Sequence, residues 1–289
     1  MNGFFEILFS PDVPFIRNAL FAGILSSILF GILGSVVTVK RIAGLAGAIS
    51  HAVLGGIGIA LYLSATGIVP SLSPMVGAII FAILSAFIIG AVSLKSKQRE
   101  DTVIQAIWAI GMSIGVLFMA KTPGYTDPSS YLFGNILLIS SRDLILLAIL
   151  DVIVLFLAWR FYPQIEATSF DEEFAAVRGI PTQTVFLIIL SVTAVAVVLL
   201  QTFVGIVMVI AMLTLPAGTA GYTARNLASM MLLSTLYSLL FSAGGLAVGW
   251  SLDLPVGAVV VVLSGLVFLG FATATVIRKK RSSRGPSSD

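Results

Sequence analysis

The sequence predicts an all-α integral membrane protein, a polytopic bundle of eight or nine transmembrane helices. Of its 289 residues, 58% are hydrophobic and only 10% are charged, and the mean hydropathy is +1.10. Soluble domains carry roughly 25% charged residues. A single core could not hide this much apolar surface, so we expect lipid to surround most of the chain. The composition therefore excludes a soluble enzyme.

Long apolar segments follow one another along the chain. A spanning helix needs about 20 apolar residues, and the nine candidate segments are 15–39, 45–66, 73–94, 102–120, 143–159, 183–201, 203–222, 228–250 and 255–277. The stretch from Gly179 to Ala224 holds no charged residue, but only Gln201, Thr202 and Phe203 separate its two candidate spans. The alternative to nine spans is therefore eight, with part of this stretch tilted, broken or re-entrant.

The positive charges fall mainly on one side of these spans. With the N-terminus outside, thirteen of the 16 lysines and arginines lie on the inner side, as expected because short cytoplasmic loops retain them. They are Lys40, Arg41, Lys95, Lys97, Arg99, Arg160, Arg178, Arg225, Arg278, Lys279, Lys280, Arg281 and Arg284. Only Arg17, Lys121 and Arg142 lie on the other side. An odd number of spans then places the C-terminus in the cytoplasm, with residues 1–280 as a single transmembrane domain and 281–289 as a disordered basic tail.

The inner loop after the fifth span predicts a short amphipathic helix at about 169–179. Ser169 and Glu172 have the spacing of a capping box, Arg178 lies in the last turn and Gly179 follows as a stop. Such a helix is too short to cross a membrane.

Three apolar side chains of this helix, Phe170, Phe174 and Val177, are spaced four and three residues apart. They would share one face. That face could dock on lipid, on the protein itself or on a partner.

His51 is the single histidine of the chain and lies inside the second apolar segment. Ionisable groups at membrane depth are costly and rarely face lipid. Gly44, Gly47, Gly55 and Gly58 lie seven and four residues to either side of it, so all five residues share one helical face. Small residues let another helix approach closely, so His51 should point into the bundle. We favour a place on a transport path, and the alternative is an interhelical hydrogen bond that only fixes packing.

Two other features could carry chemistry in an apolar chain. Asp151 is the only carboxylate deep in a span, and it could relay a proton or cation, although a protonated or interhelically hydrogen-bonded acid is the commoner arrangement. Met208, Met212 and Pro216 follow at spacings of four residues. A thioether pair beside a broken helix could line a metal path, although core packing is the commoner role.

Several types of site are excluded or disfavoured. The sequence Gly111-Met112-Ser113-Ile114-Gly115 matches a hydrolase nucleophile pattern but lies within a continuous apolar segment, where the two glycines form a helix-packing pair. With no cysteine and one histidine, the chain cannot build a thiolate site or a zinc cage of several imidazoles. It contains no phosphate-binding G-x-x-x-x-G-K-[ST] sequence, so any nucleotide that drives it is bound by another polypeptide.

The ordered set of motifs resembles the permease subunits of bacterial and archaeal ABC-type uptake systems for manganese, zinc and iron. The similar residues extend from about 15 to 275, and they are Val39-Lys40-Arg41, Ser50-His51-Ala52, Asp101, Tyr131-Leu132-Phe133-Gly134-Asn135, Phe170-Asp171-Glu172-Glu173-Phe174-Ala175, Gly179-Ile180, Leu215-Pro216-Ala217 with Ala220, and Leu254-Pro255-Val256-Gly257. The resemblance implies a type II importer in the cytoplasmic membrane. Two permease subunits, identical or paralogous, would form the path, two separate ATPases would bind on the cytoplasmic side, and an extracytoplasmic protein would deliver the metal.

The resemblance also implies roles for particular residues. The 169–179 helix corresponds to the family's coupling segment, which docks on the ATPase. His51 corresponds to the histidine of the family's S-H-A motif on the metal path, beside Ser50 and Gly47. Many relatives carry aspartate where this chain has Gly47, so a paired aspartate–histidine metal site does not carry over. Carboxylates favour manganese and imidazole favours zinc, so we expect zinc rather than manganese or iron.

The sequence thus predicts a non-enzymatic permease subunit of an ATP-driven divalent metal importer, with no permanently bound cofactor and no nucleic-acid partner. Two alternatives remain. A permease of the same fold could carry an iron chelate or cobalamin through a wider path. An ion-coupled secondary transporter would use Asp151 but leave the 169–179 helix without a role.

Overall fold

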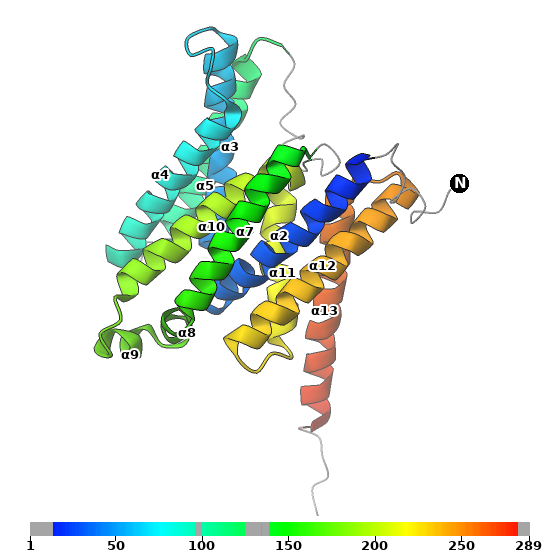
Figure 1. The fold of residues 1–289 in the computed structure, drawn as a ribbon. Coiled ribbons are helices and arrows are strands. Elements are labelled where there is room, and N and C mark those ends of the chain that lie inside the picture. The colour runs from blue at the N-terminus through cyan, green and yellow to red at the C-terminus, as the bar shows by residue number, and fades with distance from the viewer. Residues whose placement is uncertain (1–13, 96–99, 125–133, 135–138, 283–289) are drawn as a thin grey trace, which may run out of the picture.

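A computed structural model describes residues 14–95, 100–124, 134 and 139–282. This part of the chain is helical throughout, which confirms the expected all-α class, and no strand occurs within it (Figure 1). The helices are α2 Pro14–Val39, α3 Ala43–Ala65, α4 Pro74–Lys95, α5 Glu100–Lys121, α7 Ser141–Arg160, α8 Tyr162–Phe170, α9 Glu172–Val177, α10 Thr182–Val204, α11 Ile206–Gly221, α12 Leu227–Leu252 and α13 Val256–Ser282. The tail expected to be disordered from 281 begins later, because α13 continues to Ser282. Residues 283–289 and most of the 121–142 loop, with its Tyr131-Leu132-Phe133 motif, lie outside the described residues.

Each of the nine expected apolar segments contains a helix. In the described part of the chain, 7 helices are long and apolar enough to cross a membrane, namely α2, α3, α4, α5, α10, α12 and α13. The pair α7 and α8 is a further candidate, with a bend of 73° between its members. The segment expected at 203–222 forms α11, which has only 16 residues.

The helices run between two ends of the bundle. At the first, which we call the α8–α9 end, the Lys40 side chain after α2 donates a hydrogen bond to Thr168 of α8, and the backbone N–H of Ala228 in α12 donates to the Tyr162 hydroxyl. At the opposite end, the rings of Phe15 in α2 and Trp250 in α12 lie 5.9 Å apart. Helices α2 and α12 are therefore antiparallel neighbours, and Figure 1 shows them side by side.

The short helix α11 starts at the opposite end, where Gly205 separates it from α10. Gly205 has φ 82° and ψ 159°, a backbone conformation that is essentially restricted to glycine, so the two helices cannot continue as one. Gly134 packs directly against the backbone of this junction. At the other end of α11, the Tyr222 ring lies 6.1 Å from the Phe268 ring of α13.

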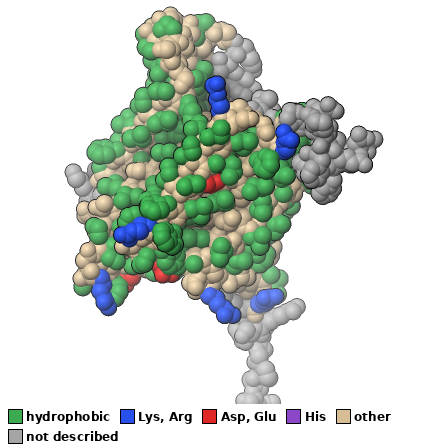
Figure 2. All heavy atoms as spheres, in the orientation of Figure 1, with side chains coloured by type: hydrophobic (Ala, Val, Ile, Leu, Met, Phe, Trp, Pro, Cys, Tyr) green, Lys and Arg blue, Asp and Glu red, His purple; other side chains and the backbone are tan. Residues whose placement is uncertain are grey.

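Helix α3 is at the centre of the fold and α13 is at its edge. In the apolar window of α3, 83% of residues are buried, against 11% for α13. Figure 2 shows hydrophobic side chains over the middle of the visible face, with most of the lysine and arginine side chains in view toward its ends. Large apolar residues such as Phe87, Val152 and Leu232 are exposed on this bundle. An apolar girdle between charged ends is the surface expected of a chain surrounded by lipid.

The helix expected at 169–179 is shorter and starts later than the sequence indicated. Asp171 caps α9, because its carboxylate accepts a hydrogen bond from the Phe174 N–H at 2.8 Å. Ser169 instead belongs to α8, where its hydroxyl donates to the Ile165 carbonyl at 2.6 Å. The helix ends as expected, with Gly179 at φ +79°.

Candidate functional site

His51 lies on α3 against a partner that the sequence did not indicate. Its imidazole stacks on the indole of Trp108 in α5, with ring centroids 4.3 Å apart and planes inclined by 10°. His51 is 9% exposed, and its Nδ1 atom is buried with no hydrogen-bond partner among the described residues. Packing against Trp108 therefore holds the imidazole in place, and its Nδ1 atom still lacks a hydrogen-bond partner in the described part of the chain.

Glycines place α3 against α5 on one side of His51. A Cβ atom at Gly55 would lie 2.8 Å from the carbonyl oxygen of Gly111, and one at Gly58 would lie 2.5 Å from that of Gly115. Real Cβ atoms do not approach backbone this closely, so the two helices meet backbone to backbone. The glycine pair of α5 is thus a packing pair, as the sequence suggested.

On the other side of His51 the same stripe is open. A Cβ atom at Gly47 would meet nothing within 4 Å, and one at Gly44 would only touch Ile104 at 3.9 Å. His51 therefore lies where the backbone contact between α3 and α5 gives way to looser packing, with α5 still beside α3 at Ile104 and open space at Gly47. This position suits a side chain that binds a passing ligand.

The sequence analysis did not identify Trp108 as a partner of His51, because the two residues lie on different helices and their contact depends on how α3 and α5 pack. A signal was nonetheless present in the sequence. Trp108 precedes Gly111 by three residues and Gly115 by seven, so the three residues share one face of α5. Had the glycine pair been assigned to contact with α3, the same face would have brought the indole toward His51.

The remaining candidates do not gather around His51. The Ser50 hydroxyl donates to the Ala46 carbonyl of its own helix at 2.9 Å. Asp151 is 3% exposed, and both carboxylate oxygens lack a hydrogen-bond partner among the described residues, but its helix α7 packs mainly on α2. Met208 and Met212 are buried in the hydrophobic core. The described residues contain no group of three or more His, Cys, Asp or Glu side chains that could hold a metal ion.

Ser113 has none of the features of a nucleophile. It lies on the exposed side of α5, and its hydroxyl donates to the Ala109 carbonyl within the helix at 2.7 Å. A nucleophile elbow requires a strained turn between a strand and a helix. Regular helix surrounds Ser113 instead.

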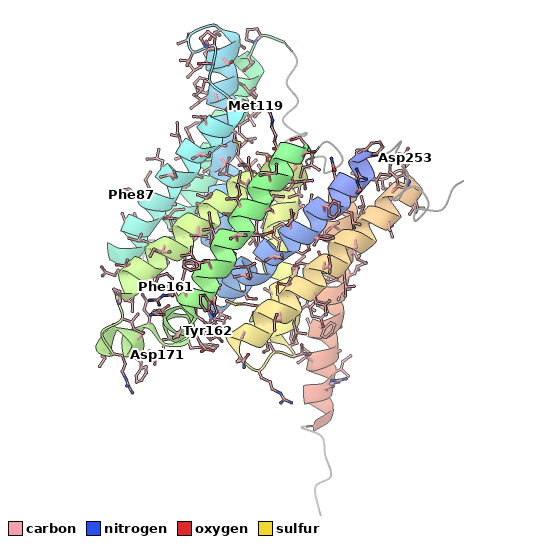
Figure 3. All side chains as sticks on the ribbon, in the orientation of Figure 1. Phe87, Met119, Phe161, Tyr162, Asp171 and Asp253 are labelled. Atoms are coloured by element: carbon pink, nitrogen blue, oxygen red, sulfur yellow. The ribbon has the colours of Figure 1, made fainter. Side chains whose placement is uncertain are left out.

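A second candidate region is the docking segment, which we define as α8 and α9. Phe170, Phe174 and Val177 are exposed in it, Val177 by 88%, and the guanidinium of Arg178 lies over the Phe174 ring at 5.0 Å. Ala175 of α9 is fully buried, and Thr168 of α8 is also buried. Figure 3 shows Asp171, the cap of α9, at the end of the bundle. The three apolar side chains are thus exposed at the α8–α9 end, but they do not share one helix as expected, because Phe170 ends α8 and the other two belong to α9.

The acidic residues of this segment are also on its surface. Asp171, Glu172 and Glu173 are exposed and follow one another at the start of α9. Carboxylates in a first helical turn are favourable, because they lie near the positive end of the helix dipole. A partner that docks here would meet apolar and negatively charged side chains together.

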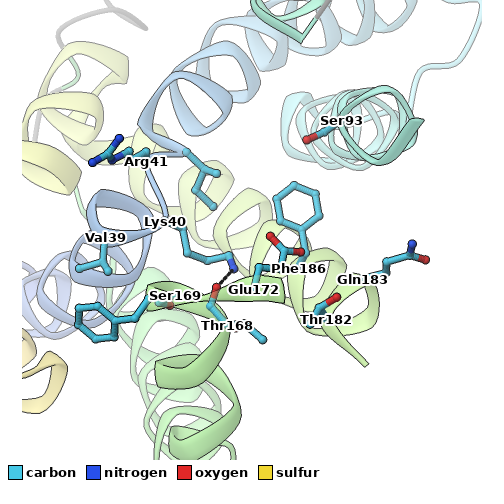
Figure 4. Close-up of a pocket in the computed structure, with 12 residues that line it drawn as sticks. Val39, Lys40, Arg41, Ser93, Thr168, Ser169, Glu172, Thr182, Gln183 and Phe186 are labelled. Carbon is cyan, nitrogen blue, oxygen red and sulfur yellow. Dashed lines mark hydrogen bonds between the residues drawn. The ribbon is translucent and has the colours of Figure 1, made fainter. Parts of the chain in front are cut away.

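Two hydrogen bonds fasten the docking segment to the bundle. The Lys40 ammonium donates to the Thr168 carbonyl at 2.8 Å, across the wall of a hollow of about 790 Å³ that Arg41, Glu172 and Phe186 also line (Figure 4). Burial lowers the pKa of Lys40 from its ordinary value, and the Glu172 carboxylate acts in the opposite direction. The hydrogen bond to the Thr168 carbonyl compensates the Lys40 ammonium for the water that it loses on burial.

The second hydrogen bond lies at the start of the segment, where α7 bends into α8 (Figure 3). The Tyr162 hydroxyl donates to Glu166 Oε1 at 2.7 Å and accepts from the Ala228 N–H at 3.1 Å. Neither Lys40 nor Tyr162 was singled out for this role from sequence, because both contacts join residues far apart in the chain.

Comparisons with known proteins agree over nearly the whole chain. Residues 12–275 match the model of the ABC 3 transport family. The chain is 37% identical over 261 residues to a "probable metal transport system membrane protein" of Chlamydia trachomatis, covering 90% of this chain and 89% of that protein. It is 32% identical over 269 residues to the manganese import system permease protein ScaB of Streptococcus parasanguinis, covering 92% and 93%. Its fold is similar to that of PsaBC from Streptococcus pneumoniae, solved in complex with Fab, with a TM-score of 0.77, 31% identity and coverage of 89% and 90%.

Proposed function

The chain belongs to the ABC 3 transport family of metal-transport permeases, and from that membership we propose that it forms the translocation path of an ATP-driven divalent metal importer. Two permease subunits, either two copies of this chain or this chain and a paralogue, would enclose the path. Separate ATPase subunits would supply the energy, and a binding protein outside the membrane would deliver the metal.

The observation that carries this proposal is the environment of His51. A neutral imidazole nitrogen is a common metal ligand, and here a buried nitrogen without a hydrogen-bond partner among the described residues lies on a central helix, one turn from the open space at Gly47. Stacking on Trp108 holds the ring in one orientation, which reduces the entropy lost when a ligand binds. A single imidazole from each subunit would bind an ion weakly, and weak binding suits a site from which the ion must leave again.

The identity of the metal is a separate proposal. The sequence favours zinc, because Gly47 leaves His51 without a nearby carboxylate. That preference has no support among the relatives named above, of which ScaB is named for manganese. We therefore propose manganese as the first ion to test and zinc as its competitor.

The proposed orientation places the α8–α9 end in the cytoplasm of a bacterial or archaeal cell. The inner-side cations of the described chain include Lys40, Arg160, Arg178 and Arg225, and they lie in or beside the turns at this end. This orientation agrees with the retention of positive charge by cytoplasmic loops. The exposed Phe170, Phe174 and acidic residues of α9 would then dock on the ATPase, and the C-terminus would be cytoplasmic.

The decisive experiment measures uptake in vesicles that contain the permease, the ATPase and the binding protein. Manganese, zinc and iron are supplied in turn, with and without ATP. His51→Ala is expected to reduce uptake while assembly and basal ATP hydrolysis persist, and Ser113→Ala serves as the matched control on the exposed face of α5. Normal uptake by His51→Ala would remove His51 from the path and leave it a packing residue.

A second variant tests the docking segment. Phe174→Asp replaces an exposed apolar contact by a charge, so we expect it to weaken ATPase capture and to separate ATP hydrolysis from uptake. Unchanged capture together with unchanged uptake would contradict the assignment of this face. The matched control is Leu252→Asp, which places the same charge on an exposed residue at the end of α12 opposite the α8–α9 end.

One observation favours a second candidate function, an ion-coupled secondary transporter. Asp151 is buried in α7 with both carboxylate oxygens unpaired among the described residues, which is the arrangement of a proton or cation relay. Uptake driven by an ion gradient without ATP, and lost in Asp151→Asn, would support that function. Copurification of an intact metal chelate would instead indicate the wider path of a chelate permease.

A further inference from the structure

The docking segment is joined by a hydrogen bond to the turn that leads into the helix of His51. Lys40 lies in the turn between α2 and α3, and its Nζ atom donates to the carbonyl oxygen of Thr168 at 2.8 Å. Thr168 lies in the last turn of α8, where carbonyl groups lack a partner within the helix. A cation at a helix C-terminus also interacts favourably with the helix dipole. The hydrogen bond therefore gives the Thr168 carbonyl the partner that the helix does not supply, and it places the Lys40 charge where the helix dipole favours a cation.

The turn that carries Lys40 is short and internally hydrogen-bonded. The Lys40 N–H donates to the Val36 carbonyl at 2.9 Å, and the Ile42 N–H donates to the Val37 carbonyl at 2.9 Å. Arg41 between them adopts φ +58°, and α3 begins at Ala43. A displacement of the Lys40 backbone is therefore transmitted to the first turn of α3 without a flexible linker. His51 lies eight residues further along the same helix.

The docking segment is also held at its other end. The Tyr162 hydroxyl accepts a hydrogen bond from the Ala228 N–H, which is one of the unpaired N–H groups of the first turn of α12. The segment from Tyr162 to Thr168 is thus fastened to α12 at its start and to the α2–α3 turn near its end. A force on α9 cannot be absorbed by movement of α8 alone.

We propose that Lys40 is a positioning residue that couples movement of the docking segment to α3 and so to His51. This inference rests on the proposed function, since it requires an ATPase that moves α9. Lys40 contacts neither the metal nor the ATPase in this role. Its hydrogen bond makes the inner end of α3 follow α8 during each cycle.

The test compares the number of metal ions taken up per ATP hydrolysed in vesicles containing the full complex. Lys40→Met keeps the aliphatic stem and removes the donor, Lys40→Arg restores a cationic donor, and Arg41→Asn removes the neighbouring charge while tolerating the positive φ. We expect Lys40→Met to lower the ratio about tenfold, the effect of losing a charge-assisted hydrogen bond. ATP hydrolysis should change by less than about twofold, because no ATPase contact is removed. Lys40→Arg and Arg41→Asn should keep the wild-type ratio.

The outcomes distinguish coupling from support of the fold. If Lys40→Met assembled poorly but its assembled fraction kept the wild-type ratio, Lys40 would be a structural residue and the proposal would be overturned. An equal loss in Arg41→Asn would indicate a general charge effect and would also overturn it. Lys40→Leu, which also lacks a donor, replaces Lys40→Met if the latter does not assemble, and a wild-type ratio there counts against coupling. If the wild-type complex showed no ATP-dependent uptake, the proposed function would fail and this inference with it.

Discussion

The backbone contact between α3 and α5 predicts opposite results for one substitution at two glycines of the same stripe. An alanine Cβ at Gly58 would lie 2.5 Å from the Gly115 oxygen and 2.8 Å from its Cα, whereas ordinary contact begins at 3.4 Å. Backbone atoms cannot rotate away, so α5 must retreat. At Gly47 the added Cβ meets nothing within 4 Å. The two variants have the same change in composition and differ only in available space.

The expected magnitudes follow from this difference. Overpacking costs about 1–3 kcal/mol, and replacing a helical glycine by alanine returns roughly 0.5–1 kcal/mol. Gly58→Ala should therefore destabilise the protein by on the order of 1 kcal/mol, and Gly47→Ala should be neutral or stabilising. For a chain of this size, 1 kcal/mol corresponds to roughly 2–4 °C in Tm.

The assay is thermal unfolding of the purified permease in detergent, followed by circular dichroism at fixed protein and detergent concentration. Gly58→Ala should unfold at a lower temperature than the wild type, and Gly47→Ala at the same or a higher temperature. Equal Tm values for the two variants would refute the reasoning, since they would mean that α3 and α5 are not in backbone contact at Gly58. A lower Tm for Gly47→Ala alone would show that the space beside Gly47 is filled.

Substitutions at three further positions test other contacts. Trp108→Ala should lower metal uptake, because the His51 ring loses its stacking partner, while Trp108→Phe keeps most of it; equal uptake by the two variants would contradict this. Asp151→Leu should raise Tm if the buried carboxylate is only a structural liability, and a loss of uptake at unchanged Tm would assign Asp151 to the path instead. Tyr162→Phe leaves the Ala228 N–H unpaired and should lower the stability by about 1 kcal/mol, measured by the same unfolding assay; an unchanged Tm would show that the hydrogen bond contributes nothing net.

The helical segments were predictable because hydropathy is a local property of the chain. Each apolar segment of the sequence contains a helix. The segment at 203–222 was the one for which the sequence left open whether a full span forms. That segment forms α11, which begins only at Ile206 because Gly205 interrupts the helix before it. The sequence showed the absence of a polar linker there, but it could not show that a glycine in a special backbone conformation would separate the two helices.

The predicted start of the short helix at Ser169 was wrong because two residues could cap its first turn. Ser169 and Asp171 are each followed three residues later by a residue with an available N–H, and local rules favoured the serine with Glu172 behind it. In the structure, α8 extends through Ser169, so Asp171 becomes the cap. The extension of α8 is stabilised by the Lys40 contact at Thr168, which involves residues 128 positions apart and has no local signature.

The candidate site was predicted only in part for the same reason. His51 was recognisable because a single histidine among glycines in an apolar segment stands out in any reading of the sequence. Its contact with Trp108, the separation of Asp151 on a different helix and the open space beside Gly47 depend on how helices pack. The pattern of small residues indicated that α3 and α5 each allow another helix to approach closely, but not that they contact each other.

The stack of His51 on Trp108 also supplies an optical reporter of occupancy. The chain has three tryptophans, and the other two, Trp159 and Trp250, lie on α7 and α12. With both replaced by phenylalanine, the remaining fluorescence would come from an indole in van der Waals contact with the imidazole. A paramagnetic ion such as Mn²⁺ bound to that imidazole would quench the emission, whereas Zn²⁺, with its closed d shell, would not. Quenching of the emission from this single residue would therefore report Mn²⁺ bound at His51.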